Sequence, residues 1–135
     1  MRHHTVTTVL DAPAERAFGY LSQVENLPRW ATEFARELKH EDGRWKIVNG
    51  LGEFVFAIEA DESSGVIDMY AGPSDEALGR FPTRVVGLPD GRSAFTFTMF
   101  QGPDQPDEQF EGQYESLLRE LENVKRELAQ SPPAA

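Results

Sequence analysis

Residues 106–130 read PDEQFEGQYESLLRELENVKRELAQ, and their apolar side chains recur at the spacing of one helix face. At about 100° per residue, the apolar positions occupy an arc of roughly 120° that continues for about six turns. These positions are Phe110, Tyr114, Leu117, Leu118, Leu121, Val124 and Leu128. A helix of this length extends roughly 36 Å. The pattern therefore predicts an equally long apolar surface elsewhere in the chain, against which the helix packs.

The chain before this helix has the alternation and the turn signals of β-strands. We predict strands at residues 3–10, 34–42, 44–49, 53–61, 66–71, 81–88 and 92–101. Turn residues separate them, with Pro89-Asp90-Gly91 as the tightest hairpin signal. Helix-start signals predict two short helices after the first strand, at about residues 14–21 and 26–30. The predicted fold class is α+β, with one strand, two helices, six strands and one long helix.

The composition fits one domain and excludes several classes of function. The chain has 135 residues, no cysteine, and 13 basic against 23 acidic residues, a net charge of -10. A chain of this length buries a core without disulfides, and the absence of cysteine excludes thiol catalysis and cysteine-ligated zinc. The acidic balance opposes nucleic acid and anionic membranes as partners.

Neither a signal-peptide pattern nor a membrane span is visible, since no apolar run reaches the roughly 18 residues that a span needs. We therefore expect a cytoplasmic monomer or homodimer without membrane insertion. Its single domain is expected at residues 1–130, followed by a disordered tail at 131–135.

The order of elements resembles the START-like (SRPBCC) superfamily over nearly the whole chain. The motifs that carry the resemblance lie at residues 11–15 (DAPAE), 26–30 (NLPRW), 65–68 (GVID), 82–86 (PTRVV), 95–101 (FTFTMFQ) and 121–128 (LENVKREL). Their order is similar to that of the bacterial branch called polyketide cyclase/dehydrase-like. The resemblance implies the helix-grip fold, in which a strongly bent antiparallel sheet wraps around the long C-terminal helix. It also implies a deep, largely apolar cavity between them.

Several apolar side chains are candidates for the wall of such a cavity. They are Trp30, Phe34, Trp45, Phe54, Phe56, Phe97, Met99, Phe110, Tyr114 and Leu117. Small-molecule sites commonly have apolar walls with a few convergent polar groups. For each of these residues the alternative is ordinary core packing. Tyr114 also carries a hydroxyl, which needs a partner if it is buried.

The polar candidates are Asp68, Tyr70, Arg84 and Gln101, which stand in otherwise apolar strands. Alternation allows Asp68 and Tyr70 to share a face, and hairpin pairing could bring Arg84 near Gln101. An inward-pointing Asp68 and Arg84 must be paired, because isolated buried charges are costly. A structural salt bridge is one interpretation. In the other, Arg84 anchors a carboxylate, carbonyl or phenolate of the ligand.

No metal site or cofactor is predicted. His3 and His4 lie at the chain end, and His40 lies in a charged strand. In the branch that the chain resembles, the residue after the aspartate of the GVID motif is often histidine, but here it is Met69. Acid–base chemistry would therefore fall to Asp68, Tyr70, Tyr114 or a glutamate with a raised pKa.

Three hypotheses for the function follow. The first is binding of an apolar or aromatic small molecule between helix and sheet. The second is a polyketide aromatase/cyclase that holds a folded substrate and assists enolisation and dehydration. The third is a protein-interaction module like the Aha-type co-chaperones. An open cavity supports the first two hypotheses, and a filled interior supports the third.

Overall fold

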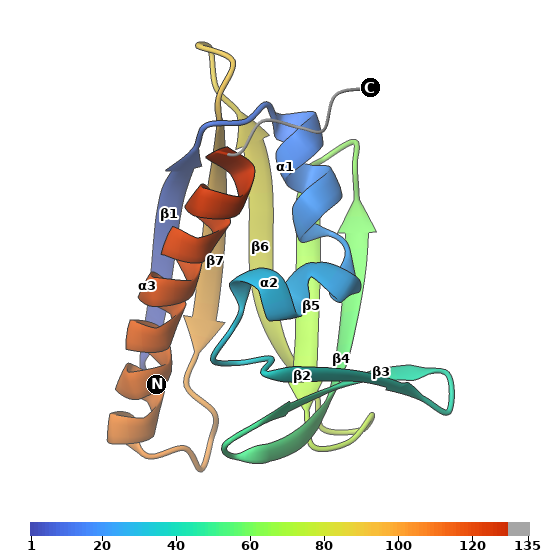
Figure 1. Cartoon of the computed structure of the whole chain (residues 1–135). Coiled ribbons are helices and arrows are strands. Elements are labelled where there is room, and N and C mark those ends of the chain that lie inside the picture. Colours follow the sequence, from blue (N-terminus) through green and yellow to red (C-terminus); the bar gives the residue numbers. More distant parts are fainter. Residues whose placement is uncertain (130–135) are drawn as a thin grey trace.

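The computed structural model describes residues 1–129, which form a seven-stranded antiparallel sheet with helices on one face (Figure 1). The strands are β1 (His3–Leu10), β2 (Glu37–Glu41), β3 (Arg44–Asn49), β4 (Gly52–Asp61), β5 (Val66–Gly72), β6 (Gly79–Gly87) and β7 (Ser93–Phe100). The helices are α1 (Ala14–Leu21), the 3-10 turn η1 (Val24–Asn26), α2 (Leu27–Trp30) and α3 (Asp107–Ala129). The predicted tail, together with residue 130, lies outside the described residues.

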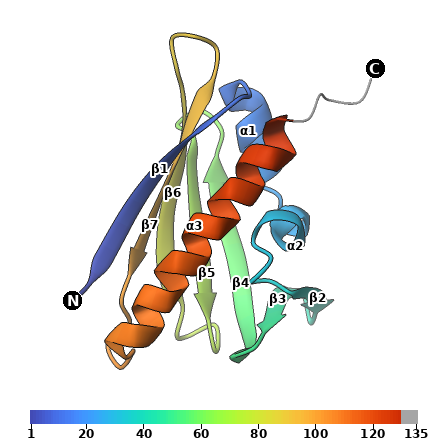
Figure 2. The same cartoon turned by 60° about the vertical axis from the view of Figure 1, so that its left-hand side comes forward.

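The strand order is β1-β7-β6-β5-β4-β3-β2, so consecutive hairpins build most of the sheet and β1 returns to pair with β7. This confirms the predicted α+β class with a long C-terminal helix packed on an antiparallel sheet. In Figure 1, β2 and β3 run across the view, whereas β6 and β7 stand upright. Figure 2 shows α3 lying obliquely in front of the sheet, beside α1 and α2.

The alternation of β7 assigns its side chains to two faces. Phe95, Phe97 and Met99 are buried under the helices. Thr96 and Thr98 point to the opposite face, where their hydroxyls lie 3.1 Å and 2.9 Å from those of Thr7 and Thr5 on β1. One face of the sheet therefore forms the core, and the other faces solvent and carries these paired threonines.

The long helix buries a stripe that is shifted from the predicted one. Phe110, Leu117, Leu121, Val124 and Leu128 are buried as predicted, and Glu120 is buried with them. Leu118 remains 39% exposed, so its predicted place in the apolar stripe is wrong. Leu118 and Glu120 lie about 200° apart around the helix, because each residue turns it by about 100°. The buried stripe is therefore displaced toward the Glu120 side. None of the helices in residues 1–129 combines the length and the apolar character of a membrane span.

The strand predicted from residue 34 begins later, at Glu37. A turn precedes it, in which the Ala35 N–H donates to the Ala31 carbonyl at 2.7 Å. The N–H of Phe34 donates to Glu120 instead of to a neighbouring strand. Because of this turn, β2 begins at Glu37 and not at the predicted residue 34.

Candidate functional site

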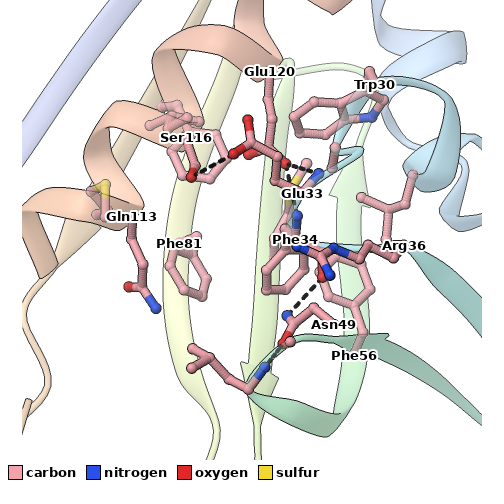
Figure 3. A pocket seen from close by; sticks show the side chains of 18 residues that line it. Trp30, Glu33, Phe34, Arg36, Asn49, Phe56, Phe81, Gln113, Ser116 and Glu120 are labelled. Carbon is pink, nitrogen blue, oxygen red and sulfur yellow. Dashed lines mark hydrogen bonds between the residues drawn. The ribbon is translucent and has the colours of Figure 1, made fainter. Parts of the chain in front are cut away.

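A cavity of about 460 Å³ lies between α3, the segment around α2 and the covered face of the sheet. Most of its wall is apolar or aromatic. In Figure 3, the polar side chains Gln113, Ser116 and Glu120 come from α3, and Phe81 and Phe56 come from the sheet. The exposed Arg36 and Leu51 also line it, so the cavity opens to solvent beside the β3–β4 turn.

The pairing register of β5, β6 and β7 determines which side chains form the aromatic wall of the cavity. Met69 on β5 pairs with Phe81 on β6, and Thr83 pairs with Phe97 on β7, so these side chains share the covered face. The rings of Phe81 and Phe97 lie 6.0 Å apart. From the α2 side, Phe34 meets Phe56 edge-on, also at 6.0 Å. The result is a wall of aromatic rings supported by neighbouring strands.

The rim of the cavity is held by hydrogen bonds of Asn49. Its Nδ2 donates to the Phe34 carbonyl at 2.8 Å, and its Oδ1 accepts the Leu51 N–H at 2.9 Å. These bonds connect the segment after α2 to the β3–β4 turn. Leu51 itself is 61% exposed and lies at the opening.

Glu120 is the charged residue of the cavity wall that is most deeply buried, with 5% of its surface exposed. Its Oε2 accepts two backbone N–H groups, from Glu33 at 3.1 Å and from Phe34 at 3.0 Å. Burial raises the pKa of the Glu120 carboxyl to about 7, although the two N–H groups act in the opposite direction. A carboxyl with such a pKa exists in both protonation states near neutral pH.

The second oxygen of this carboxyl, Oε1, belongs to a side chain that lines the cavity. Within residues 1–129 it has no hydrogen-bond partner, yet no fully buried side-chain oxygen there lacks one. Oε1 therefore retains some accessible surface, and the side chain that carries it lines the cavity.

Glu33 forms a second acidic group beside Glu120, in a different environment. Arg119 donates to both of its carboxylate oxygens, at 2.8 Å and 2.7 Å, and the Ser116 hydroxyl donates at 3.1 Å. The hydrogen bonds from Arg119 hold the pKa of the Glu33 carboxyl below its usual range. Glu33 is therefore ionised at neutral pH, and both of its oxygens accept hydrogen bonds. In Glu120, by contrast, the hydrogen bonds within residues 1–129 go to Oε2.

The structure brings some of the predicted residues to this cavity. They are Trp30, Phe34, Phe56, Phe97, Met99 and Leu117. They come from α2, the segment after it, β4, β7 and α3.

The predicted polar residues of β5 and β6 point away from the cavity. Ile67 and Met69 occupy the covered face of β5, so Asp68 and Tyr70 lie on the other face. Arg84 is likewise exposed on β6, where its Nε donates to the Ser64 carbonyl at 3.1 Å. The prediction that these side chains contribute polar groups to the cavity is therefore corrected. The physical reason is that the apolar residues of each strand occupy its buried face.

Gln101 is also away from the cavity and from Arg84. Arg84 pairs with Thr96 in the sheet, whereas Gln101 follows the end of β7. The Gln101 amide donates to the Gln105 carbonyl and to Asp107, at 2.9 Å and 2.6 Å. Its role is to connect β7 to the start of α3.

The remaining predicted aromatic residues pack elsewhere. Phe110 and Tyr114 stack on His4 of β1, with ring centroids 5.5 Å and 3.7 Å away. Trp45 lies 4.6 Å from the His40 ring and lines a separate hollow beside β3 and β4. Phe54 packs half-buried against the core. These side chains support the fold rather than the cavity.

Sequence reasoning missed several residues of the wall, including Met69, Phe81, Gln113, Ser116 and Glu120. A signal for Glu120 exists in the sequence, since it lies three residues after Leu117 and four before Val124, both of which are buried. A residue with this spacing lies beside the buried face of the helix.

The known proteins that this chain resembles are found by comparing structures. No protein-family model matches the sequence, and no curated protein matches it. Zhui aromatase/cyclase from Streptomyces sp. R1128 superposes with a TM-score of 0.72 and 19% identity, over 95% of this chain and 93% of that one. A START superfamily protein from Mycobacterium smegmatis gives a TM-score of 0.67 and 16% identity, over 95% and 97%.

The Aha1 dimer from Colwellia psychrerythraea is also similar, with a TM-score of 0.69 and 13% identity over 95% of this chain and 96% of that one. The resemblance predicted from the sequence is confirmed at the level of structure, because these proteins and this chain share one architecture. The chain has the helix-grip fold of START-like proteins.

Proposed function

We propose that this protein binds an apolar or aromatic small molecule in the cavity between α3 and the sheet. The observation that carries the proposal is the cavity of about 460 Å³ with its aromatic wall. Ligand pockets typically measure about 300–1,000 Å³ and combine apolar walls with a few polar groups. The cavity also favours this proposal over an Aha-like interaction module, for which a filled interior is expected.

The test uses a neutral fluorescent probe, N-phenyl-1-naphthylamine, whose emission rises in apolar surroundings. Wild-type protein is expected to bind it saturably. Leu117→Trp places an indole in the cavity and is expected to weaken binding about tenfold or more, since each 1.4 kcal/mol is a factor of ten. Leu118→Trp is the matched control, because Leu118 is the next residue of α3 and is 39% exposed. It is expected to bind the probe as the wild type does.

Two results would overturn the proposal. One is a wild-type protein that leaves the probe in water at all concentrations. The other is equal weakening by both tryptophan variants, which would place the probe outside the cavity. Circular dichroism checks that both variants are folded, which we expect because overpacking by an indole costs only about 1–3 kcal/mol.

A second candidate function is acid–base chemistry on the bound molecule, of the kind that an aromatase/cyclase-type enzyme requires. The observation that favours it is the Glu120 carboxyl, which lines the cavity and has a pKa of about 7. As a base, Glu120 would take a proton from the carbon beside a carbonyl group and leave an enolate.

This second candidate is tested with 2-acetonaphthone in deuterium oxide. Proton NMR would show faster loss of the methyl signal with wild-type protein than with buffer. Glu120→Gln should return the exchange to the buffer rate, while Glu115→Gln, an exposed glutamate of the same helix, should not. Exchange that survives in Glu120→Gln would remove this candidate without affecting the binding proposal.

A further inference from the structure

We infer that the ligand of this cavity is a hydroxylated aromatic compound whose hydroxyl group donates a hydrogen bond to Oε1 of Glu120. This inference rests on the proposed function and names the chemical class that the site selects. It disfavours the corresponding ethers, which lack the donor. It also disfavours aromatic carboxylates, which would bring a negative charge beside Glu33 and Glu120.

Two backbone hydrogen bonds to one oxygen fix the orientation of the Glu120 carboxyl. Oε2 of Glu120 accepts the N–H groups of both Glu33 and Phe34, so this oxygen is already occupied. Oε1 is the atom that remains for a guest molecule. Ionised Glu120 therefore presents a hydrogen-bond acceptor to the cavity and no donor.

The surroundings of Oε1 make this acceptor selective. The cavity wall includes Phe34, Phe81 and Leu117, whose side chains carry no hydrogen-bond donor for a carboxylate. An apolar guest that displaces water from Oε1 leaves it unpaired, which is costly for a charged group. A hydroxyl group restores the hydrogen bond, and bonds to ionised acceptors are the stronger kind.

The same geometry predicts the effect of Glu120→Gln. The glutamine side chain must turn its oxygen to the two backbone N–H groups, because its NH₂ cannot accept from them. Its NH₂ then faces the cavity. The substitution thus replaces an acceptor by a donor at almost the same place, and the preference between hydroxyl and ether should reverse.

Protonation of Glu120 has an equivalent effect in the wild type. Because Oε2 faces two N–H donors, the proton of the neutral carboxyl must reside on Oε1 and point into the cavity. The charged groups near it are Glu33, which raises its pKa, and Arg119, which lowers it. Arg36 lines the cavity nearer its opening. The wild type should therefore prefer hydroxyl compounds above a pH of about 7 and lose that preference below it.

The experiment measures displacement of N-phenyl-1-naphthylamine by 2-naphthol and by 2-methoxynaphthalene. At about pH 8 the wild type should bind 2-naphthol about tenfold more tightly, the value of one charged hydrogen bond. Glu120→Gln should bind 2-methoxynaphthalene at least as tightly as 2-naphthol. Glu115→Gln, exposed on α3, should keep the wild-type preference.

Equal affinities for the two probes in the wild type at about pH 8 would overturn the inference while leaving cavity binding intact. An unchanged preference in folded Glu120→Gln would also overturn it. If neither compound binds and the fluorophore itself fails to bind, the proposed function falls as well. Should Glu120→Gln not fold, the wild type at about pH 5.5 provides the same comparison, and a preference that persists there would contradict the inference.

Discussion

The imidazole of His4 lies flat on the phenol ring of Tyr114, with ring centroids 3.7 Å apart and planes 9° from parallel. Nε2 of the same imidazole is 3.0 Å from Oε2 of Glu111. One side chain of β1 therefore contacts two successive turns of α3. These contacts hold the N-terminal half of α3 against the sheet, and Tyr114 points to β1 instead of into the cavity.

The Glu111 contact predicts a dependence of stability on acid pH. The hydrogen bond to His4, together with Arg2, holds the pKa of the Glu111 carboxyl below its usual 4.5. The unfolded chain therefore binds more protons than the folded one below this pH, and stability is lost as pH falls through the folded pKa. Wild type should be more stable than Glu111→Gln above a pH of about 4.5, and the difference should shrink in acid.

Urea unfolding of both proteins from neutral to acid pH measures this difference. Glu108→Gln is the control, since Glu108 is exposed in the first turn of the same helix. A gap between wild type and Glu111→Gln that stays constant over the whole pH range would contradict the prediction.

The raised pKa of Glu120 predicts that the free energy of unfolding falls as pH rises, the opposite of the trend expected for Glu111. Its pKa is raised from 4.5 to about 7, so the folded state holds a proton that the unfolded chain has already lost. Stability is complete below the unfolded pKa and falls as pH rises toward the folded one. Between these limits the wild type should lose roughly 3 kcal/mol relative to Glu120→Gln, because one pKa unit corresponds to about 1.4 kcal/mol.

The measurement is again the free energy of unfolding in urea, with Glu115→Gln as the control on the same helix. Parallel curves for wild type and Glu120→Gln between pH 4.5 and about 7 would show that the carboxyl is not desolvated in the folded protein.

Arg84→Met is expected to leave ligand binding unchanged. The guanidinium lies on the solvent-facing side of β6 and donates to the carbonyl of Ser64. Displacement assays with the naphthalene probes should give the wild-type affinity within a factor of about two. A tenfold loss of affinity would restore Arg84 as a ligand anchor and contradict its outward placement.

Gly65→Ala should destabilise the fold strongly. Gly65 has a φ of +78°, and a Cβ there would collide with the carbonyl oxygen of Val85. Val85 in turn donates its N–H to the Gly65 carbonyl at 2.9 Å, so neither backbone is free to shift. We expect a loss of roughly 2 kcal/mol or more from strain and collision together.

Gly43→Ala is the matched control for this loss. Gly43 has a similar φ of +74°, but its Cβ would meet no atom within 4 Å. Its substitution should cost only the strain, about 1 kcal/mol. Equal losses in the two variants would show that close approach to Val85 is unimportant.

Much of the fold could be predicted from the sequence because its elements have clear periods. The alternation around Phe95, Phe97 and Met99 locates a strand with one buried face, and the spacing from Phe110 to Leu128 locates the long helix. Local patterns of this kind depend on neighbouring residues alone.

The sequence does not show which face of β5 is buried. Both of its faces carry large side chains, with Met69 on one and Tyr70 on the other. The structure buries Ile67 and Met69, since the alternative would place the Asp68 carboxylate under the helices.

The burial of Glu120 in the cavity wall is the feature that the sequence predicts least well. A glutamate in an amphipathic helix is usually solvated, and this one is buried only because two backbone N–H groups satisfy it. Those groups belong to residues 86 and 87 positions earlier in the chain. The size of the cavity depends in the same way on how side chains from distant segments pack.

Ligand binding in the cavity is tested most directly by an NMR titration of the wild-type protein with 2-naphthol at about pH 8. The backbone amides of Glu33 and Phe34 contact Glu120 and report on its carboxyl. Binding in the cavity should give saturable shifts of these two amides and of the Leu117 amide in the wild type. The Leu117→Trp variant should show no comparable shifts. Shifts confined to the solvent-facing side of the sheet, or none at all, would contradict binding in the cavity.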